Sequence, residues 1–587
     1  MSNELPYSYH TFLFPFIWKT KPEITLGKFE EILQVGKTWT ERKWNVLMQA
    51  QDVSCDEKKK NEWFQNYAAY QYFTSAANNA IFNADGKGVV KCYVFNKQNG
   101  TYSVHKRLKI PFCSEQTENY RQICTEAKHR IYGKTLRIVR NLGKDTVQVC
   151  KRYKCCILKE QVLALKINQI RLNVYEAGIA IMIFELEYNP ENDNDRTLDA
   201  VNMINEYGRR INFPFLMESS HLLCADWISV QFDGSKEIKE DFLGTAKNIK
   251  KHIQGDEKGC RCSLNYVMKP IQDILDGGQK IITSNPAHRD KYGMFLIKPC
   301  TDDRMFVCCA IQDAALSQEL KGVGSEGISF LKDVNVRKAD GEGDETTLSS
   351  RLYKLIFVEN RLTCQDNTMK QKLLKACVYR RWINYGTVHG MTHHSFVMVN
   401  NGKDIPSINA FLTEYVQMAI LALAQRSVLL MLEDEAAEIS NSFSDETVIS
   451  HEELEEIEHL QEKYVKIQNQ LLLSEITVQE QGVELYEMLR EQLYIKKNMD
   501  DLDGEMNNLR DISNIANARL ERQSDADEEN KFNMLGLLMG LLALVEPLAM
   551  IFTKNDEDCW EGLVWFFISI IVVAVILFKY RPFKKKK

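Results

Sequence analysis

The sequence has little of what marks the common classes of enzyme and metalloprotein. Its 16 cysteines are scattered singly or as neighbours, without the two CxxC elements that a structural zinc site needs. GKT at 36–38 lacks the upstream glycine of a phosphate-binding loop, and the histidines at 389, 393 and 394 have no HExxH partner. We therefore expect no catalytic residues, no metal site, no cofactor and no enzymatic activity.

A secretory signal peptide is also missing. No basic residues precede the short apolar stretch within the first 20 residues, and no small-residue cleavage site follows it. A net charge of -6 gives no overall basic surface for nucleic acid. The 587 residues suffice for two or three domains. We expect most of the chain to stay inside the cell, with reduced, buried thiols.

Patterned segments in the first 440 residues predict an α+β domain. Residues 165–188 alternate apolar and polar positions on either side of a Glu-Ala-Gly turn, which predicts a β-hairpin. Residues 197–207 place apolar side chains at helical spacing before Gly208, which predicts a helix. Strand, strand and helix in this order are typical of an α+β core.

Shorter signals complete this domain. Phe12, Phe14 and Phe16 predict a buried strand, which Pro15 would confine to a sheet edge or to the strand's end. Further strands are expected at 353–358 and 395–399, and a helix at about 408–432.

The composition changes after residue 433. An acidic, serine-rich stretch precedes apolar residues at heptad spacing between Tyr464 and Leu509, which predicts a long stalk helix. Two apolar runs follow at 532–552 and 562–578, separated by an acidic connection and ended by the basic tail KYRPFKKKK. The positive-inside rule then places both termini in the cytoplasm of a multi-pass protein of the inner membrane.

These boundaries give the expected domain organisation. The expected segments are a soluble sensor domain at 1–440, a stalk helix or coiled coil at 441–530, transmembrane helices at 531–553 and 562–579, an external loop at 554–561 and a basic tail at 580–587.

A soluble α/β part, a long helix, two spans and a lysine-rich tail together resemble the CorA family of divalent-cation channels. The resemblance covers the architecture of the last ~130 residues, and it implies a homo-oligomer, a pentamer in that family. The family's Gly-Met-Asn triplet is absent: the chain reads AMIFTKN where it would end the first span.

The soluble part is similar to CorA-like effectors associated with type III CRISPR antiviral defence. The segments that carry this similarity are the hairpin at 165–188, INEYGRRINFPFL at 204–216 and RRWINYGTVHGMTHHSFVMV at 380–399. This similarity implies an ion channel switched by a nucleotide second messenger, S-adenosylmethionine conjugated to AMP.

Two arginine pairs are candidates for the ligand site. The forked guanidinium groups of Arg209, Arg210, Arg380 and Arg381 suit phosphate, and Tyr207, Trp382 and Tyr385 would offer aromatic faces for an adenine. The alternative is that adjacent arginines are solvated or paired with carboxylates. The sequence leaves open whether the two pairs meet.

The first span contains a carboxylate near mid-membrane. Glu546 is followed by Pro547, and Gly536 and Gly540 form a GxxxG element that favours close helix packing. We expect Glu546 to face a central cation pathway. The other residues expected to line this pathway or its mouth are Asn533, Asp556, Glu557 and Asp558.

Other functions remain open. One alternative is that the chain is a magnesium or divalent-cation transporter. Another is that it is a membrane-anchored coiled-coil scaffold without conduction. A scaffold needs no polar residue at mid-membrane, whereas a channel does. The expected partners of the channel are copies of itself, the lipid bilayer, cations and the messenger.

Overall fold

The computed structural model describes the chain in several stretches. These are residues 6–20, 24–43, 67–97, 99–111, 139–142, 145–149, 155–212, 224–242, 244–245, 267–301, 303–325, 347–359, 364–442, 450–552, 564 and 567–568. The chain divides into two compact units, one formed by Met1–Ala437 with Leu460–Asp503 and one by Glu438–His459 with Gly504–Lys587.

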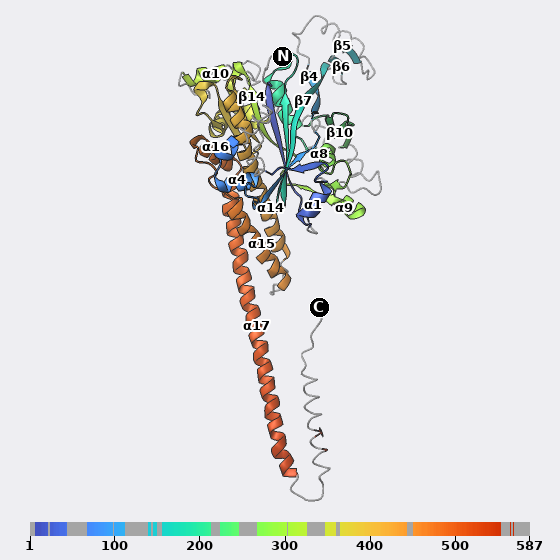
Figure 1. Ribbon diagram of the computed structural model, residues 1–587, viewed down its shortest axis with the longest axis vertical. Helices are drawn as coiled ribbons and strands as arrows, with labels where there is room; N and C mark the ends of the chain where they lie inside the picture. The colour runs from blue at the N-terminus through green and yellow to red at the C-terminus, as the bar shows by residue number, and fades with distance from the viewer. Residues whose placement is uncertain are drawn as a thin grey trace, which may run out of the picture. The chain divides into compact units, whose positions relative to one another are not determined.

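A large mixed β-sheet organises the first unit (Figure 1). The main path of this sheet runs β10-β9-β4-β7-β8-β1-β14-β17-β16-β15. The pairs along it are antiparallel except for β14 and β17, which are parallel. The strands are β1 (Ser8–Ile17), β2 (Trp39–Glu41), β3 (Val90–Phe95), β4 (Gly100–Pro111), β5 (Val139–Leu142), β6 (Asp145–Val149), β7 (Cys155–Tyr175), β8 (Ile179–Tyr188), β9 (Trp227–Phe232), β10 (Ile238–Asp241), β11 (Ile282–Thr283), β12 (Phe295–Leu296), β13 (Lys298–Pro299), β14 (Phe306–Gln312), β15 (Val378–Tyr379), β16 (Val388–Thr392) and β17 (Ser395–Asn400).

Helices connect and cover these strands. They are α1 (Leu26–Ile32), α4 (Ser75–Phe82), α6 (Leu198–Gly208), α8 (Lys269–Leu275), α9 (Pro286–Tyr292), α10 (Ala314–Ser325), α11 (Leu348–Phe357), α12 (Asn367–Cys377), α13 (Ile405–Ala410), α14 (Val416–Ser442), α15 (His451–Gln470), α16 (Glu480–Gln492) and α17 (Ile495–Phe552). Three short elements are the 3₁₀ turns η1 (Asp193–Asp195) and η3 (Ile383–Tyr385) and the π-helical turn η4 (Phe411–Tyr415). The expected α+β character is therefore confirmed for the soluble part.

The predicted hairpin and the helix after it are both present. β7 and β8 are antiparallel and turn at Gly178, whose φ of +112° an L side chain rarely adopts. α6 begins where expected, because the Thr197 hydroxyl accepts a hydrogen bond from the Ala200 amide at 3.2 Å. The expected strand at 395–399 and the helix at 408–432 correspond to β17 and to α13–η4–α14.

Pro15 was expected to confine the first strand to a sheet edge or to stand at the strand's end, and the edge alternative is wrong. β1 is central, pairing with β8 along its whole length and with β14 on its other side. Pro15, which has no amide proton, lies where that second neighbour changes from β14 to β13. Its carbonyl still accepts from the Cys300 amide at 3.1 Å, so the missing donor falls at a gap in the ladder.

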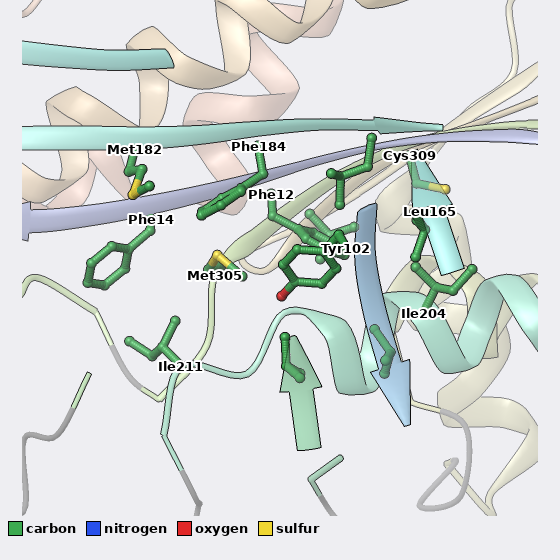
Figure 2. Close-up of a cluster of buried hydrophobic side chains, with 14 of the residues drawn as sticks. Phe12, Phe14, Tyr102, Leu165, Met182, Phe184, Ile204, Ile211, Met305 and Cys309 are labelled. Atoms are coloured by element: carbon green, nitrogen blue, oxygen red, sulfur yellow. The ribbon is translucent and has the colours of Figure 1, made fainter. Parts of the chain in front are cut away.

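The core fills the space between the sheet and α6 (Figure 2). Phe12, Phe184 and Tyr102 are fully buried, and Ile204 of α6 belongs to the same cluster. The Tyr102 hydroxyl donates to the Gly208 carbonyl at 2.6 Å, which ties the end of α6 to β4. A Cβ at Gly208 would lie 3.2 Å from side-chain atoms of Phe12, so the last turn of α6 approaches the sheet closely.

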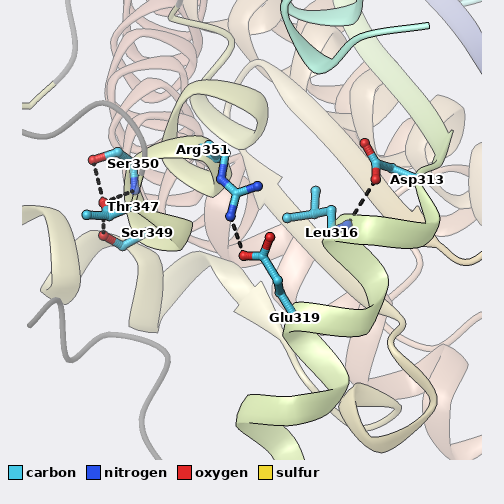
Figure 3. A network of polar contacts seen from close by, with 7 residues as sticks. All are labelled: Asp313, Leu316, Glu319, Thr347, Ser349, Ser350 and Arg351. Atoms are coloured by element: carbon cyan, nitrogen blue, oxygen red, sulfur yellow. Dashed lines mark hydrogen bonds and ion pairs between the residues drawn. The ribbon is translucent and has the colours of Figure 1, made fainter. Parts of the chain in front are cut away.

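Residues 353–357 belong to a helix and Val358 caps it, which corrects the strand expected at 353–358. The Thr347 hydroxyl caps α11 by accepting from the Ser350 amide at 3.3 Å (Figure 3). Arg351 forms an ion pair with Glu319 of α10. Leu352, Leu355 and Ile356 lie on the buried side of the helix. In the sequence they form a short apolar run, which is compatible with a buried helix and with a buried strand.

One helix in the described part of the chain is long and apolar enough to cross a membrane. It spans Ile405–Asn441 and has a mean hydropathy of 1.5 in its most apolar window, of which 89% is buried inside the protein. This is weak support for membrane association, because a buried core helix meets the same criterion.

The region expected to form one stalk helix contains α15, α16 and the start of α17 instead. The chain leaves the helical path after α15 because Leu471 and Ile476 are buried, and the Gln425 amide donates to the Leu471 carbonyl at 2.7 Å. A second break falls at Tyr494, whose φ is +57°. Most heptad residues between Tyr464 and Leu502 are therefore buried within the first unit, whereas Val478 is exposed and Met506 and Leu509 belong to the second unit.

The last helix continues through the first predicted span. α17 extends to Phe552 and is helical at Glu546, whose side chain lies outside the described residues. Asn533 is exposed on this helix. Asp556, Glu557, Asp558 and nearly all of the second predicted span lie outside the described residues.

Candidate anion-binding site

Three arginines meet where α6 ends. Arg209 follows the last turn of α6, and its carbonyl accepts from the Met305 amide at 2.7 Å. Arg210 and Arg304 form an isolated antiparallel bridge, and the Ile211 amide donates to the Asp303 carbonyl at 3.0 Å. The segment after α6 is thus held against the segment that leads into β14, which brings three guanidinium groups together.

Arg209 is the least compensated of them. It is 1% exposed, and its Nη2 donates to the Val358 carbonyl at 3.3 Å. Its Nε and Nη1 atoms are buried without a hydrogen-bond partner in the described part of the chain. Arg210 differs, because it forms an ion pair with Asp303, which also lies 3.2 Å from Nε of Arg304. Two strong, buried donors of Arg209 therefore have no acceptor among the described residues.

The electrostatic field around Arg209 opposes its own charge. Burial, together with the neighbouring charges of Arg304 and Arg210, lowers the pKa of Arg209 to about 9. Glu206 and Asp303 act in the opposite direction without restoring the usual value. A bound anion would reverse this balance, since an opposite charge favours the protonated guanidinium.

The end of α11 forms another side of the site. Val358 adopts a φ of +54°, which a β-branched residue rarely does, and this turns the end of the helix beside Arg209. Glu359 follows, and the Tyr353 hydroxyl donates to its carboxylate at 3.2 Å. Burial raises the pKa of Glu359 although Arg209 and Arg304 favour its ionised form. One partly buried carboxylate thus stands beside the arginines.

Two histidines complete the cluster from the turn between β16 and β17. His394 accepts from the Val307 amide through its carbonyl at 3.0 Å, and Nη1 of Arg426 donates to the His393 carbonyl at 3.2 Å. Their rings lie 3.8 Å apart, centre to centre. Burial and the charge of Arg209 lower the pKa of His394 to about 2. Burial and the nearby arginines also lower the pKa of His393, and His393 is exposed, so the cluster has a side open to solvent.

This arrangement gathers the kinds of donors that bind anions in proteins. We call Arg209, Arg210, Arg304, His393 and His394 the arginine cluster. Forked guanidinium groups and neutral N–H donors suit the oxygens of phosphate or carboxylate. Among the described residues, no group of three His, Cys, Asp or Glu side chains could hold a metal ion.

The second predicted arginine pair lies in a different setting. Arg380 is exposed, and Arg381 donates to Glu484 at 2.7 Å and to Glu480 at 2.8 Å. The hydrogen bonds that Arg381 donates to Glu484 and Glu480 raise the pKa of Arg381, so this guanidinium already has carboxylate partners on α16.

The aromatic residues of the predicted site differ in exposure. Trp382 and Tyr385 are 38% and 68% exposed, with ring centres 6.1 Å apart, so both remain open to a ligand or partner. Tyr207 is fully buried, and the Lys106 ammonium lies 4.7 Å from its ring centre. The stacking role expected for Tyr207 is therefore wrong, since no face of its ring is accessible.

The arginine cluster and its immediate neighbours include residues that the sequence did not single out. Arg304, Glu359 and Arg426 follow no motif and come from separate segments of the chain. The sequence offers no metal-binding motif around His393 and His394. Their position in a two-residue hairpin turn is the feature that could have pointed to the cluster.

No protein-family model, curated protein or solved structure matches this chain.

Proposed function

We propose that this chain is a CorA-like membrane effector of antiviral defence, an ion channel opened by a nucleotide second messenger that binds the soluble domain. The observation that carries the ligand-binding part is the buried Arg209 guanidinium, two of whose nitrogens lack an acceptor among the residues that the structure describes. A buried donor without a partner lowers the stability of the folded protein by about 1–3 kcal/mol. Retention of such a donor therefore favours a role in binding. Binding of a phosphate group would satisfy both donors.

The ligand class follows from the chemistry of the cluster. Arg209, Arg210 and Arg304 favour a ligand with at least one anionic oxygen group, and His393 and His394 add neutral donors at the open side. The resemblance of the soluble part to CRISPR-associated effectors points to S-adenosylmethionine-AMP, whose phosphate would be the group held here.

The membrane part of the proposal rests on the C-terminal sequence. An apolar run with Glu546 and a GxxxG element favours several first spans packed around one axis, with a second span returning the chain to the cytoplasm. A homo-oligomer, a pentamer by resemblance, would then form a cation pathway in the inner membrane. The alternatives are a divalent-cation transporter that needs no messenger and a scaffold that does not conduct.

Cation flux into liposomes tests the proposal. Purified full-length protein is expected to conduct only after S-adenosylmethionine-AMP is added, with cyclic oligoadenylates as the comparison. Arg209→Gln is expected to abolish the response while the protein stays folded, because it removes the cluster's central charge. The control is Arg381→Gln, which changes the charge equally at an exposed position and is expected to respond normally.

Each alternative has its own outcome. Flux without any nucleotide would favour a transporter, and no flux under any condition would favour a scaffold. A response lost in Arg381→Gln but kept in Arg209→Gln would move the ligand site to the exposed arginine pair.

A further inference from the structure

A second cationic feature lies apart from the arginine cluster. A pocket of about 530 Å³ is lined by residues of the α1–β2 connection, the β3–β4 and β9–β10 turns, α8 and the loop after α8. Five of the lining residues are lysines, which we call the lysine pocket: Lys37, Lys97, Lys236, Lys269 and Lys280. The volume falls within the range of roughly 300–1,000 Å³ that is usual for small-molecule sites.

Positive charge predominates in this pocket. Glu237 and Asp273 are the carboxylates among the lining residues, against five ammonium groups. The Lys97 ammonium donates to the neutral Ser235 hydroxyl at 3.3 Å. Burial raises the pKa of Asp273, although Lys269 and Lys280 act in the opposite direction. The pocket's own carboxylates therefore compensate only part of its positive charge.

The walls of the pocket are fixed before any ligand arrives. The Asp276 carboxylate accepts from the amides of Gly278, Ile281 and Ile282 at 2.7–3.0 Å, which sets the loop that carries Lys280. The Trp39 indole donates to the Leu275 carbonyl at 3.1 Å and joins α8 to β2.

The opposite wall is held in the same way. The side-chain amide of Asn96 donates to the Lys37 carbonyl at 2.7 Å, which joins the turn bearing Lys97 to the turn bearing Lys37. Because both walls are braced, binding would need little ordering of the chain, and this favours affinity.

We propose that the lysine pocket binds a small ligand with two or more linked phosphate groups, such as a nucleoside triphosphate or an inorganic polyphosphate. Ammonium groups are compact charges with rotatable donors, and lysines from five segments can follow a chain of phosphate oxygens. The arginine cluster differs, since its forked donors suit a single oxyanion. This second site does not depend on the proposed channel function.

Calorimetry on the full-length protein in detergent tests the proposal. The probes are tripolyphosphate, ATP, AMP and orthophosphate. Tripolyphosphate and ATP are expected to bind at least tenfold more tightly than AMP and orthophosphate, and their affinity should fall as salt rises. Tighter binding of ATP than of tripolyphosphate identifies a nucleotide ligand, and equal binding identifies an inorganic polyphosphate.

Charge-neutralising variants locate the site. The double variant Lys37→Gln with Lys236→Gln is expected to weaken tripolyphosphate binding at least tenfold. The double variant Lys37→Arg with Lys236→Arg, which keeps both charges, should restore binding. Both lysines are exposed, so the fold should persist. The matched control is Lys372→Gln with Lys375→Gln on the exposed face of α12, which should bind normally.

A variant of the other site separates the two proposals. Arg209→Gln should bind tripolyphosphate as the unchanged protein does, whatever happens to channel activation. Equal affinity in the Lys37/Lys236 variant and its control would overturn the lysine-pocket proposal, as would failure of both tripolyphosphate and ATP to bind.

Discussion

At the scale of single residues, Arg209 combines a stability cost with the proposed ligand contact. Its guanidinium is fully buried beside two other arginines, and two of its nitrogens have no acceptor in the described part of the chain. Residues that lower the stability of a folded protein in this way often serve binding. Replacing such a residue then raises stability while it removes the function.

Arg209→Met should therefore stabilise the ligand-free protein. Removing two unsatisfied donors and a repelled charge should raise the free energy of unfolding by about 1 kcal/mol, while messenger binding is lost. Thermal unfolding of the full-length protein with and without S-adenosylmethionine-AMP measures both effects. A lower melting temperature in the variant would show that Arg209 is structurally satisfied.

His389 gives a prediction about pH. Its side chain is 3% exposed and is surrounded by aromatic rings. Neither ring nitrogen has a hydrogen-bond partner in the described residues, and burial lowers the pKa of His389 to about 4. Between pH 6.5 and 4 the unfolded chain binds a proton there that the folded protein does not. Stability should thus be complete above pH 6.5 and fall by about 1.4 kcal/mol per pH unit for this residue below it.

His389→Leu removes this titration without removing a hydrogen bond. Its stability at pH 7 should be close to that of the unchanged protein, and its loss of stability between pH 6.5 and 4.5 should be smaller. Chemical unfolding across this pH range measures the difference. His10, whose buried ring bonds to Asn205 at 2.7 Å and whose pKa is also lowered to about 4, will continue to contribute. An identical pH profile would mean that His389 does not titrate in this range.

At the scale of elements, the contact between α10 and η3 depends on one glycine. Gly386 has a φ of +78°, and its carbonyl accepts from the buried Ser317 hydroxyl at 2.9 Å. A Cβ there would lie 2.6 Å from the Ser317 carbonyl oxygen, closer than real contacts allow. The segment that carries Trp382 and Tyr385 is therefore positioned by this close approach.

Gly386→Ala should lower the free energy of unfolding by about 3 kcal/mol, because backbone strain adds to overpacking. Gly293→Ala is the control, since its φ of +64° brings similar strain but a Cβ would meet nothing within 4 Å. That variant should lose only about 1 kcal/mol. Denaturant unfolding of both variants gives the comparison, and equal losses would show that the contact with Ser317 relaxes.

Helix α17 gives a prediction for conduction. A carboxylate facing lipid near mid-bilayer costs on the order of 3 kcal/mol, so Glu546 on this helix should face a bundle interior or water. Glu546→Gln is expected to lower cation selectivity, and Glu546→Ala to change conductance, with the oligomer intact. Reversal potentials in planar bilayers measure this. Unchanged selectivity and conductance would mean that Glu546 is protonated and bonded to a neighbouring helix.

At the scale of the whole molecule, the proposed channel requires several copies of the chain. GxxxG at Gly536 and Gly540 allows close helix packing, and the exposed residues of α17 around it include Leu535, Leu537 and Met539. Mass photometry in mild detergents is expected to report one defined oligomer, a pentamer by resemblance. Gly536→Leu with Gly540→Leu should reduce the copy number. A monomer at all concentrations would remove the basis for a central pore.

The sequence by itself determined the elements whose periodicity is local. The alternation at 165–188 and the apolar spacings of 197–207 and 408–432 each specify a local structure, and all are present. Periodicity states which face is buried but not which partner covers it. The heptad pattern after Tyr464 therefore suggested a free stalk, although Leu471 and Ile476 pack within the first unit.

Only the tertiary structure decided the two cationic sites. Arg209 and Arg381 look alike in the sequence, each beside a second arginine and an aromatic residue, yet one is buried beside other cations and the other is paired with two carboxylates of α16. The lysines at 37, 97, 236, 269 and 280 follow no spacing at all. The physical reason is that the strength of a charge depends on burial and on neighbours from distant segments, which are set by chain crossings that no local pattern encodes.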